Sequence, residues 1–366
     1  MKNIRNIGFA ALVAVWILLT ACLWFGPAED ISEAERRPLA QMPEIKAETI
    51  LSGKFMGEFE DYTLDQFPLR DRFRQIKSLF HYYVLGQSDN NDIYIADGYA
   101  VKQEYPLKES SLNHAMDKFN HIYSKYLKDT GSRVVMAVVP DKGYYLAADS
   151  GHLSMDYEQL FETVRQELTW AEHVDLTGAL EASAYYRTDT HWRQEEILDA
   201  AAKLCQGLGV AAFEEEELVR EKIDRPFYGV YYGQAAFPMA AEELYVMGGD
   251  VLDACTVYDY ETGKTGSVYD MEKLTSRDLY DVYLSGARAL LKIENPNAAT
   301  DRELIVFRDS FGSSMVPLLV KDYKTVTVVD IRYIATDLIG NFVDFSGQDV
   351  LLLYSTLILN SSNSLK

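Results

Sequence analysis

The chain has 366 residues, of which 48% are hydrophobic and 25% are charged, a composition typical of a folded globular protein. This length allows two average domains or one large one. Acidic residues outnumber basic ones by 56 to 35, giving a net charge of −21. That balance argues against a nucleic-acid-binding protein, because such proteins gather Lys and Arg against the phosphates.

Residues 1–26 predict a targeting segment. Lys2 and Arg5 are followed by an uncharged, almost wholly apolar stretch from Ile7 to Phe25. About 20 such residues are enough to span a membrane, whereas a cleaved signal usually has a shorter apolar core. The basic flank predicts that the rest of the chain lies outside the cytoplasm. A retained single anchor in a bacterial membrane is therefore the favoured interpretation.

The cysteines leave alternatives open. The sequence Leu19-Thr20-Ala21-Cys22 resembles a bacterial lipoprotein cleavage site, so a lipidated Cys22 and a simply cleaved signal are alternatives to the anchor. Cys205 and Cys255 allow either one disulfide in an oxidising compartment or two buried free thiols. Neither has CxxC spacing and the six histidines stand apart, so no metal site is predicted.

Residues 27–88 predict a linker followed by helices. The polar run 32–39 reads as a linker that lifts the domain off the membrane. Between Glu48 and Leu85, aromatic and aliphatic residues recur at helical spacing, and Pro68 interrupts them. We therefore expect two amphipathic helices. Their aromatic residues are expected to form core, with contact to a membrane surface or a partner as the alternative.

Residues 89–366 predict an α/β domain. Two short strands are expected around the Asp97-Gly98 turn. Further strands are expected at 134–139, 172–176, 303–307, 326–329 and 350–354, and helices at 112–127, 156–167, 194–208, 313–321 and 334–342. Strands that alternate with helices predict a mostly parallel sheet flanked by helices. Residues 213–297 instead carry short Tyr- and Gly-rich runs, which predict a β-rich insertion of hairpins.

A lone serine turn, Arg308-Asp309-Ser310-Phe311-Gly312, follows an apolar strand and precedes a predicted helix. In α/β sheets this place is the carboxyl end of a strand, where ligands bind. Free N–H groups at the start of a helix also stabilise a developing oxyanion. The alternative is an ordinary helix cap, for which Ser and Asp are favoured residues.

The block from Tyr185 to Trp192 places Asp189 two residues before His191. An acid so placed orients a histidine that acts as a general base, and a histidine so oriented activates a serine hydroxyl. Asp189, His191 and Ser310 therefore predict an ester-cleaving network, with Trp192 as a wall of its pocket. The alternatives are an exposed loop histidine beside a capping residue, and a metal site made by Asp189 and His191.

These blocks resemble the DHHW-type family of bacterial exported proteins, which is related to the SGNH-hydrolase-like domains of alginate O-acetylation proteins. The strand ending in Val139-Pro140-Asp141-Lys142 and the segments 65–71, 227–232 and 280–293 extend the resemblance over nearly all of the exported part. Thr190 stands where the namesake DHHW motif has His. The alginate proteins resemble this chain in carrying Asp-Thr-His-Trp.

The resemblance implies an SGNH-hydrolase-like fold with circularly permuted blocks, in which the acid and base precede the nucleophile. Ser310 would be the nucleophile, His191 the general base and Asp189 the residue that orients it. Unrelated folds assemble such triads in different chain orders, so this order is no obstacle. The Ser310 N–H and the Gly286 turn are candidate oxyanion donors.

Two basic residues near these motifs have two interpretations. Arg308 and Lys142 either face the pocket and stabilise charge or pair with some of the many carboxylates, and ion pairing is the favoured role.

The favoured function is therefore an O-acetyltransferase or acetylesterase that modifies a cell-envelope or secreted polysaccharide and needs no cofactor. The resemblance is compatible with a membrane-bound partner protein that supplies the acetyl group. The segment from Tyr228 to Tyr258 is a candidate sugar-packing surface. One alternative is a catalytically silent glycan-binding or scaffold subunit of an exopolysaccharide machine. Another is a structural anchor that uses the helices of residues 48–85.

Overall fold

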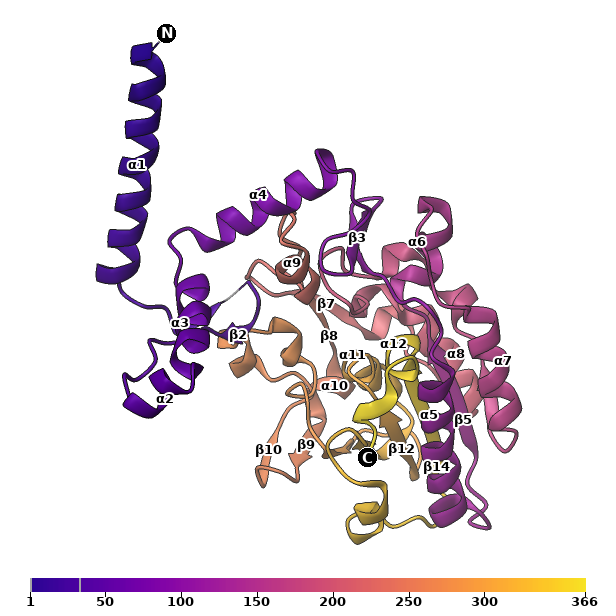
Figure 1. The fold of residues 1–366 in the computed structure, drawn as a ribbon. Coiled ribbons are helices and arrows are strands. Elements are labelled where there is room, and N and C mark those ends of the chain that lie inside the picture. The colour runs from indigo at the N-terminus through magenta and orange to yellow at the C-terminus, as the bar shows by residue number, and fades with distance from the viewer. Residues whose placement is uncertain (1, 33) are drawn as a thin grey trace. The chain divides into compact units, whose positions relative to one another are not determined.

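The computed structural model describes residues 2–32 and 34–366 (Figure 1). The chain divides into two compact units. The first contains the described residues up to Asn91 together with Tyr232–Met239, and the second contains Asp92–Tyr231 and Ala240–Lys366. The expected boundary at residues 88–89 lies close to the division after Asn91.

The first unit begins with the helix α1 (Lys2–Phe25). Its segment Asn6–Phe25 is long and apolar enough to cross a membrane, as an anchor or a signal sequence would be. The other elements of this unit are β1 (Ile31–Ser32), β2 (Arg37–Pro38), α2 (Ala47–Leu51), α3 (Lys54–Asp65) and α4 (Arg70–Tyr83). The structure thus forms α3 and α4 on either side of Pro68, as expected, and adds the short helix α2 at the start of the same segment.

The aromatic residues of α3 and α4 do not form a core, and that expectation is wrong. Neither helix buries an apolar side chain among the described residues. Phe73 and Phe80 are 45% and 49% exposed. Aromatic rings contact one another at the surface instead, as in the Phe67–Phe73 pair with centroids 5.4 Å apart. A unit of a few short helices encloses too little volume to cover them.

The second unit is built on an eight-stranded sheet with the strand order β10-β9-β11-β13-β12-β14-β5-β6. Its strands are β5 (Val134–Val139), β6 (Glu172–Val174), β9 (Thr256–Asp259), β10 (Lys264–Gly266), β11 (Leu290–Glu294), β12 (Arg302–Arg308), β13 (Tyr323–Val329) and β14 (Asp349–Ser355). The run from β13 to β6 pairs in parallel. β11, β9 and β10 add an antiparallel edge.

This sheet confirms the α/β fold and corrects the interpretation of residues 213–297. β9 and β11 belong to the central sheet, because inward-facing residues such as Val257 and Ile293 pack in its main core. Within the same segment, β7 (Val219–Lys222) and β8 (Tyr245–Gly248) form a separate antiparallel pair. Another small sheet, β3 (Ile93–Ala96) with β4 (Tyr99–Lys102), turns at Asp97 and Gly98, both with positive φ.

Helices cover both faces of the sheet (Figure 1). The α-helices of this unit are α5 (Glu109–Ile122), α6 (Lys142–Ser150), α7 (Tyr157–Glu167), α8 (Leu198–Leu208), α10 (Asp250–Ala254), α11 (Gly312–Met315) and α12 (Thr356–Leu359), and α9 (Val230–Ala235) lies at the division between the units. A π-helical turn, η1 (Tyr123–Leu127), extends α5. Short 3₁₀ turns are η2 (Thr177–Ala179), η3 (Ala182–Ala184), η4 (Gln194–Glu196), η5 (Glu215–Glu217), η6 (Met271–Thr275), η7 (Leu279–Val282), η8 (Val316–Leu319), η9 (Thr336–Asn341) and η10 (Ser362–Ser364).

Two expected helices are shorter than the sequence pattern suggests. The segment 313–321 forms α11 and then the 3₁₀ turn η8, because Pro317 cannot donate the hydrogen bond that would continue an α-helix. The segment 334–342 forms only the 3₁₀ turn η9.

Both faces of the parallel strands are buried. Along β5, Val135 packs with α8 residues such as Leu204 on one face, and Val134 packs with α5 and α7 residues such as Phe119 on the other. The continuous apolar run of this strand was expected for that reason. Cys205 and Cys255 are both buried free thiols, so the disulfide alternative is not formed.

Candidate active site

Ser310 lies at the carboxyl edge of the parallel strands, in the turn between β12 and α11. The buried Asp309 carboxylate shapes this turn. Its Oδ1 accepts the Phe311 N–H at 3.0 Å, and its Oδ2 accepts the Ser355 N–H at 2.7 Å from the end of β14. Gly312 permits the tight approach, since a Cβ there would lie 2.6 Å from the Arg308 Cβ. The serine is thereby fixed at the ends of two neighbouring strands and is half-buried.

The structure joins the three expected residues in one chain of hydrogen bonds. His191 Nδ1 lies 2.6 Å from Asp189 Oδ1, and His191 Nε2 lies 2.8 Å from Ser310 Oγ. An ionised carboxylate only accepts, so Nδ1 carries the proton and Nε2 accepts the serine hydroxyl. Asp189 is fully buried and His191 is 8% exposed. This arrangement can remove a proton from the serine hydroxyl as it attacks an ester.

The segment around α9 holds the acid in place. The Val230 N–H donates to Asp189 Oδ2 at 2.8 Å, and the Gly229 N–H donates to Thr188 Oγ1 at 2.9 Å. A Cβ on Gly229 would lie 2.2 Å from the Asp189 Cα, which leaves no room for a side chain. The segment 227–232 thus supports the orienting carboxylate directly.

Glu242 holds the other side of the same loop. Its carboxylate accepts the Arg187 N–H at 2.6 Å, the Thr188 N–H at 2.8 Å and the Thr188 hydroxyl at 2.6 Å. Sequence reasoning missed Glu242, because it lies 54 residues from Thr188 in a stretch without a recognisable motif. An antiparallel bridge between Phe227 and Glu242 brings it close to the loop.

Lys142, at the start of α6, also supports this loop. Its buried ammonium donates to the Tyr186 carbonyl at 2.9 Å and to the Arg187 carbonyl at 3.4 Å. Among the described residues no carboxylate lies within ion-pairing distance, so the favoured ion-pairing role is wrong for Lys142. Burial lowers the pKa of Lys142 from 10.5 to about 7, while the charges of Asp189 and Glu242 act in the opposite direction.

Arg308 and Gly286 contact each other rather than a substrate pocket. Arg308 is fully buried, pairs with Asp330 at 3.5 Å and donates to the Gly286 carbonyl at 3.1 Å. This geometry agrees with the favoured ion-pairing role of Arg308. The Gly286 N–H donates to the Tyr283 carbonyl at 3.0 Å, so Gly286 is not an available oxyanion donor. Among the described residues the Ser310 N–H has no acceptor, and it remains the candidate.

Trp192 does not wall an open pocket, contrary to expectation. It is fully buried, and its indole N–H lies 2.8 Å from Ser314 Oγ and 3.2 Å from the Phe311 carbonyl. It therefore fixes the turn that follows Ser310. The Tyr280 ring instead stacks on His191, and its hydroxyl lies 2.7 Å from the same Ser314 Oγ.

No group of three or more His, Cys, Asp or Glu side chains able to hold a metal ion occurs in the part of the chain that the structure describes. The candidate site consists of Ser310, His191 and Asp189, joined by hydrogen bonds and held by backbone and carboxylate contacts.

The chain matches two protein-family models. Residues 176–329 match the family model described as DHHW protein, and residues 94–233 match the model described as SGNH hydrolase-like domain, acetyltransferase AlgX. These matches confirm the expected resemblance. The DHHW match includes Asp189 and His191 and ends beyond Ser310, so the whole hydrogen-bonded chain lies inside it.

Solved structures share the SGNH-like fold. A DHHW family protein from Eubacterium siraeum superposes with a TM-score of 0.60 at 23% identity, covering 75% of this chain and 94% of that one. Bacillus cereus PatB1 with a sulfonyl adduct superposes with a TM-score of 0.58 at 18% identity, covering 75% and 95%. No curated protein matches the chain significantly. These likenesses show the fold, and the AlgX-type match over residues 94–233 supports an acyltransferase-like family.

Proposed function

We propose that the chain is an exported O-acetyltransferase that modifies a cell-envelope or secreted polysaccharide. The observation that carries the proposal is the continuous hydrogen-bonded chain from Asp189 through His191 to Ser310. It stands at the carboxyl edge of a parallel sheet, in a domain that matches an acetyltransferase family model. The family resemblance supports a polysaccharide acceptor, and the apolar helix α1 supports export.

The first step forms an acetyl-enzyme. Ser310 Oγ attacks the carbonyl carbon of an acetyl ester while its proton passes to His191 Nε2. The tetrahedral intermediate carries a negative oxygen, for which the Ser310 N–H is available as a donor. When the intermediate collapses, the donor's alcohol leaves with the proton from Nε2, and the acetyl group stays on Ser310.

The second step releases the acetyl group to an acceptor. A sugar hydroxyl gives its proton to His191 Nε2 and attacks the acetyl carbon, after which Ser310 Oγ leaves and takes that proton back. Asp189 stabilises the imidazolium that exists in both steps, through the 2.6 Å contact with Nδ1. Water in place of the sugar would give hydrolysis through the same atoms, so a bound acceptor decides the outcome.

The proposal is tested with the full-length chain in detergent, incubated with p-nitrophenyl acetate and candidate polysaccharides. We expect nitrophenol release and acetylated polysaccharide from the wild type, and neither above background from Ser310→Ala or His191→Ala. Ser361→Ala, an exposed serine outside the site, is the matched control and should keep full activity. Equal background rates from all four proteins would favour the catalytically silent glycan-binding or scaffold subunit.

A further inference from the structure

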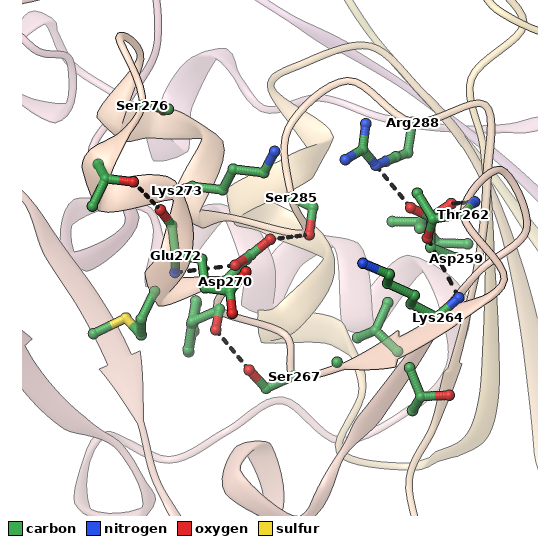
Figure 2. A pocket seen from close by; sticks show the side chains of 17 residues that line it. Asp259, Thr262, Lys264, Ser267, Asp270, Glu272, Lys273, Ser276, Ser285 and Arg288 are labelled. Carbon is green, nitrogen blue, oxygen red and sulfur yellow. Dashed lines mark hydrogen bonds and ion pairs between the residues drawn. The ribbon is translucent and has the colours of Figure 1, made fainter.

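The second unit contains a cavity of about 750 Å³ beside the β9–β10 hairpin (Figure 2). Much of its polar wall is bonded within itself, since Ser285 donates to Asp270 at 2.7 Å and Arg288 pairs with Asp259 at 2.9 Å. Such a wall needs no ligand to satisfy its polar groups. The first unit has a surface of the opposite kind, because one side of α4 is exposed although it is apolar.

This exposed side of α4 is a row of four side chains that recur every three or four residues: Phe73, Ile76, Phe80 and Tyr83. At about 100° per residue they lie within about 80° of one another around the helix. Each of the four is between 45% and 75% exposed. Single exposed apolar residues are ordinary, but a contiguous row of them marks a surface that contacts something else. We call these four residues the apolar stripe.

The other side of α4 packs within the first unit. The Arg74 guanidinium donates to the Gly233 carbonyl at 2.7 Å, and Ser78 is buried. The Tyr82 ring meets the Phe237 ring edge-on, with centroids 5.3 Å apart. Gly233 and Phe237 belong to the same compact unit as α4. The packed side therefore fixes the rotation of the helix and leaves the apolar stripe facing outward.

Basic residues lie along both edges of the apolar stripe. At helical spacing Arg72 falls beside Tyr83 on one edge, and Lys77 falls beside Phe73 on the other. Both are exposed, and among the described residues neither forms an ion pair, since the ion pairs of α4 involve Arg70 and Arg74. The helix carries four basic residues and one acidic residue in a chain of net charge −21. This exposed side thus suits an anionic partner with an apolar interior.

The unit that carries the apolar stripe also carries α1, whose segment Asn6–Phe25 is long and apolar enough to cross a membrane. Near the end of α1, the Trp24 ring contacts the Phe59 ring of α3, with centroids 5.9 Å apart. Trp side chains gather at the boundary between lipid and water. A spanning α1 would therefore hold α3 at the membrane surface, and α4 follows α3 directly after the turn 66–69.

We infer that the apolar stripe of α4 lies on the outer surface of the lipid bilayer, with Arg72 and Lys77 against anionic headgroups. A helix of 14 residues with charged side chains is too short and too polar to span, so it lies along the surface. A protein partner would cover the stripe but would not account for the basic residues on both edges or for the adjoining α1. The inference goes beyond the proposed function and requires no acetyl transfer.

Fluorescence quenching of the full-length chain in lipid nanodiscs tests this contact position by position. Cys22→Ser leaves two native cysteines that are both buried, so a cysteine placed in α4 is the one that reacts with an NBD fluorophore. Ile76→Cys and Phe80→Cys put the label on the apolar stripe, and Asp71→Cys puts it on the other side of the same helix. Because the label reports on α4 itself, insertion of α1 alone gives no difference between these positions.

In nanodiscs of phosphatidylcholine and phosphatidylglycerol, a nitroxide-labelled lipid should quench both stripe labels at least about twofold more than the label at Asp71→Cys. The added double substitution Arg72→Gln, Lys77→Gln should reduce the quenching at Ile76→Cys, because the headgroups lose their basic partners. Lys128→Gln, at an exposed lysine outside α4, should leave that quenching unchanged.

Four results would overturn the inference. They are equal lipid quenching on the two sides of α4, no lipid quenching at either stripe position, unchanged quenching in the Gln double variant, and stripe labels shielded from aqueous iodide but not quenched by lipid. The last would show a protein partner or a second copy on the stripe. Circular dichroism establishes that each variant is folded, and the second stripe position gives a reading even where the first variant unfolds. Acetyl transfer is not measured, so these results leave the proposed function standing.

Discussion

The Tyr280 ring lies parallel to the His191 imidazole, with centroids 4.0 Å apart and planes 7° apart. The electron-rich ring face covers one side of the base, and it will attract the imidazolium more than the neutral imidazole. The Tyr280 hydroxyl is held by Ser314, which also contacts the Trp192 indole. Tyr280 therefore acts on the site through His191 and is a positioning residue.

Replacing Tyr280 by Leu should lower kcat by about tenfold, because the imidazolium loses the ring face in the transition state. Tyr280→Phe keeps the ring and should retain most of that activity. Steady-state kinetics on p-nitrophenyl acetate separate kcat from KM, and Tyr260→Leu, at an exposed tyrosine, is the control. Equal kcat values for the Leu and Phe variants would contradict a role for the ring.

Glu242 should be needed to hold the His191 loop. The Glu242 carboxylate accepts three hydrogen bonds from Arg187 and Thr188, which we call the Glu242 clamp. In Glu242→Gln one oxygen becomes an NH2 group that donates, so part of this clamp is lost. We expect kcat/KM to fall by about 10- to 100-fold and the free energy of unfolding by about 1–3 kcal/mol.

The neighbouring residue supplies a matched control for that measurement. Glu243 is exposed and pairs with Lys222, so Glu243→Gln should change the free energy of unfolding by less than about 1 kcal/mol and leave turnover unaltered. If the two variants lose the same amount of activity, the clamp has no specific role.

Gly229→Ala should damage the site through the backbone. Its Cβ would lie 2.2 Å from the Asp189 Cα, so the loop must shift and the Asp189–His191 contact with it. We expect kcat/KM to fall at least about 100-fold. Gly178→Ala, where the new Cβ would come no closer than 3.8 Å to Lys203 Nζ, is the control. Steady-state kinetics and thermal melting of both variants test this prediction. A fully active Gly229→Ala enzyme would contradict it.

Lys142 predicts a particular dependence of stability on pH. Its pKa is about 7 in the folded chain against 10.5 when unperturbed, so between these values the unfolded chain binds more protons. Stability therefore rises with pH across this window, and the cost of the buried charge is fully present below pH 7. Urea unfolding in detergent at pH 7.5 and pH 9 should show the wild type gaining about 2 kcal/mol relative to Lys142→Met. A stability difference that does not change with pH would contradict the assignment.

Much of the fold follows from local patterns in the sequence. The run Val134–Val139 is apolar at every position, and the structure buries it on both faces as β5. Asp156 caps the helix that follows it, as its side-chain type suggests. The predicted helix at 313–321 was too long, because Pro317 interrupts it. The aromatic residues of α3 and α4 were wrongly predicted to form core, because these helices are exposed.

The candidate site was predictable only in its motif-bearing part. Asp189 and His191 stand two residues apart and Ser310 ends a strand, so chemistry and position both pointed to them. Glu242 and Tyr280 approach the site through contacts distant in sequence, which no local pattern encodes. Lys142 and Gly286 were predicted to contact the substrate or to have a charge partner because they stand near a motif and have suitable chemistry. In the structure their polar groups are already bonded to other parts of the chain.

The central claim is that acetyl transfer passes through Ser310. The most direct measurement is mass spectrometry of proteolytic peptides from the full-length chain quenched in acid during turnover of p-nitrophenyl acetate. The account predicts a peptide bearing one acetyl group on Ser310, absent from Ser310→Ala and strongly reduced in His191→Ala. Turnover without acetyl on Ser310, or an equal rate in Ser310→Ala, would contradict it.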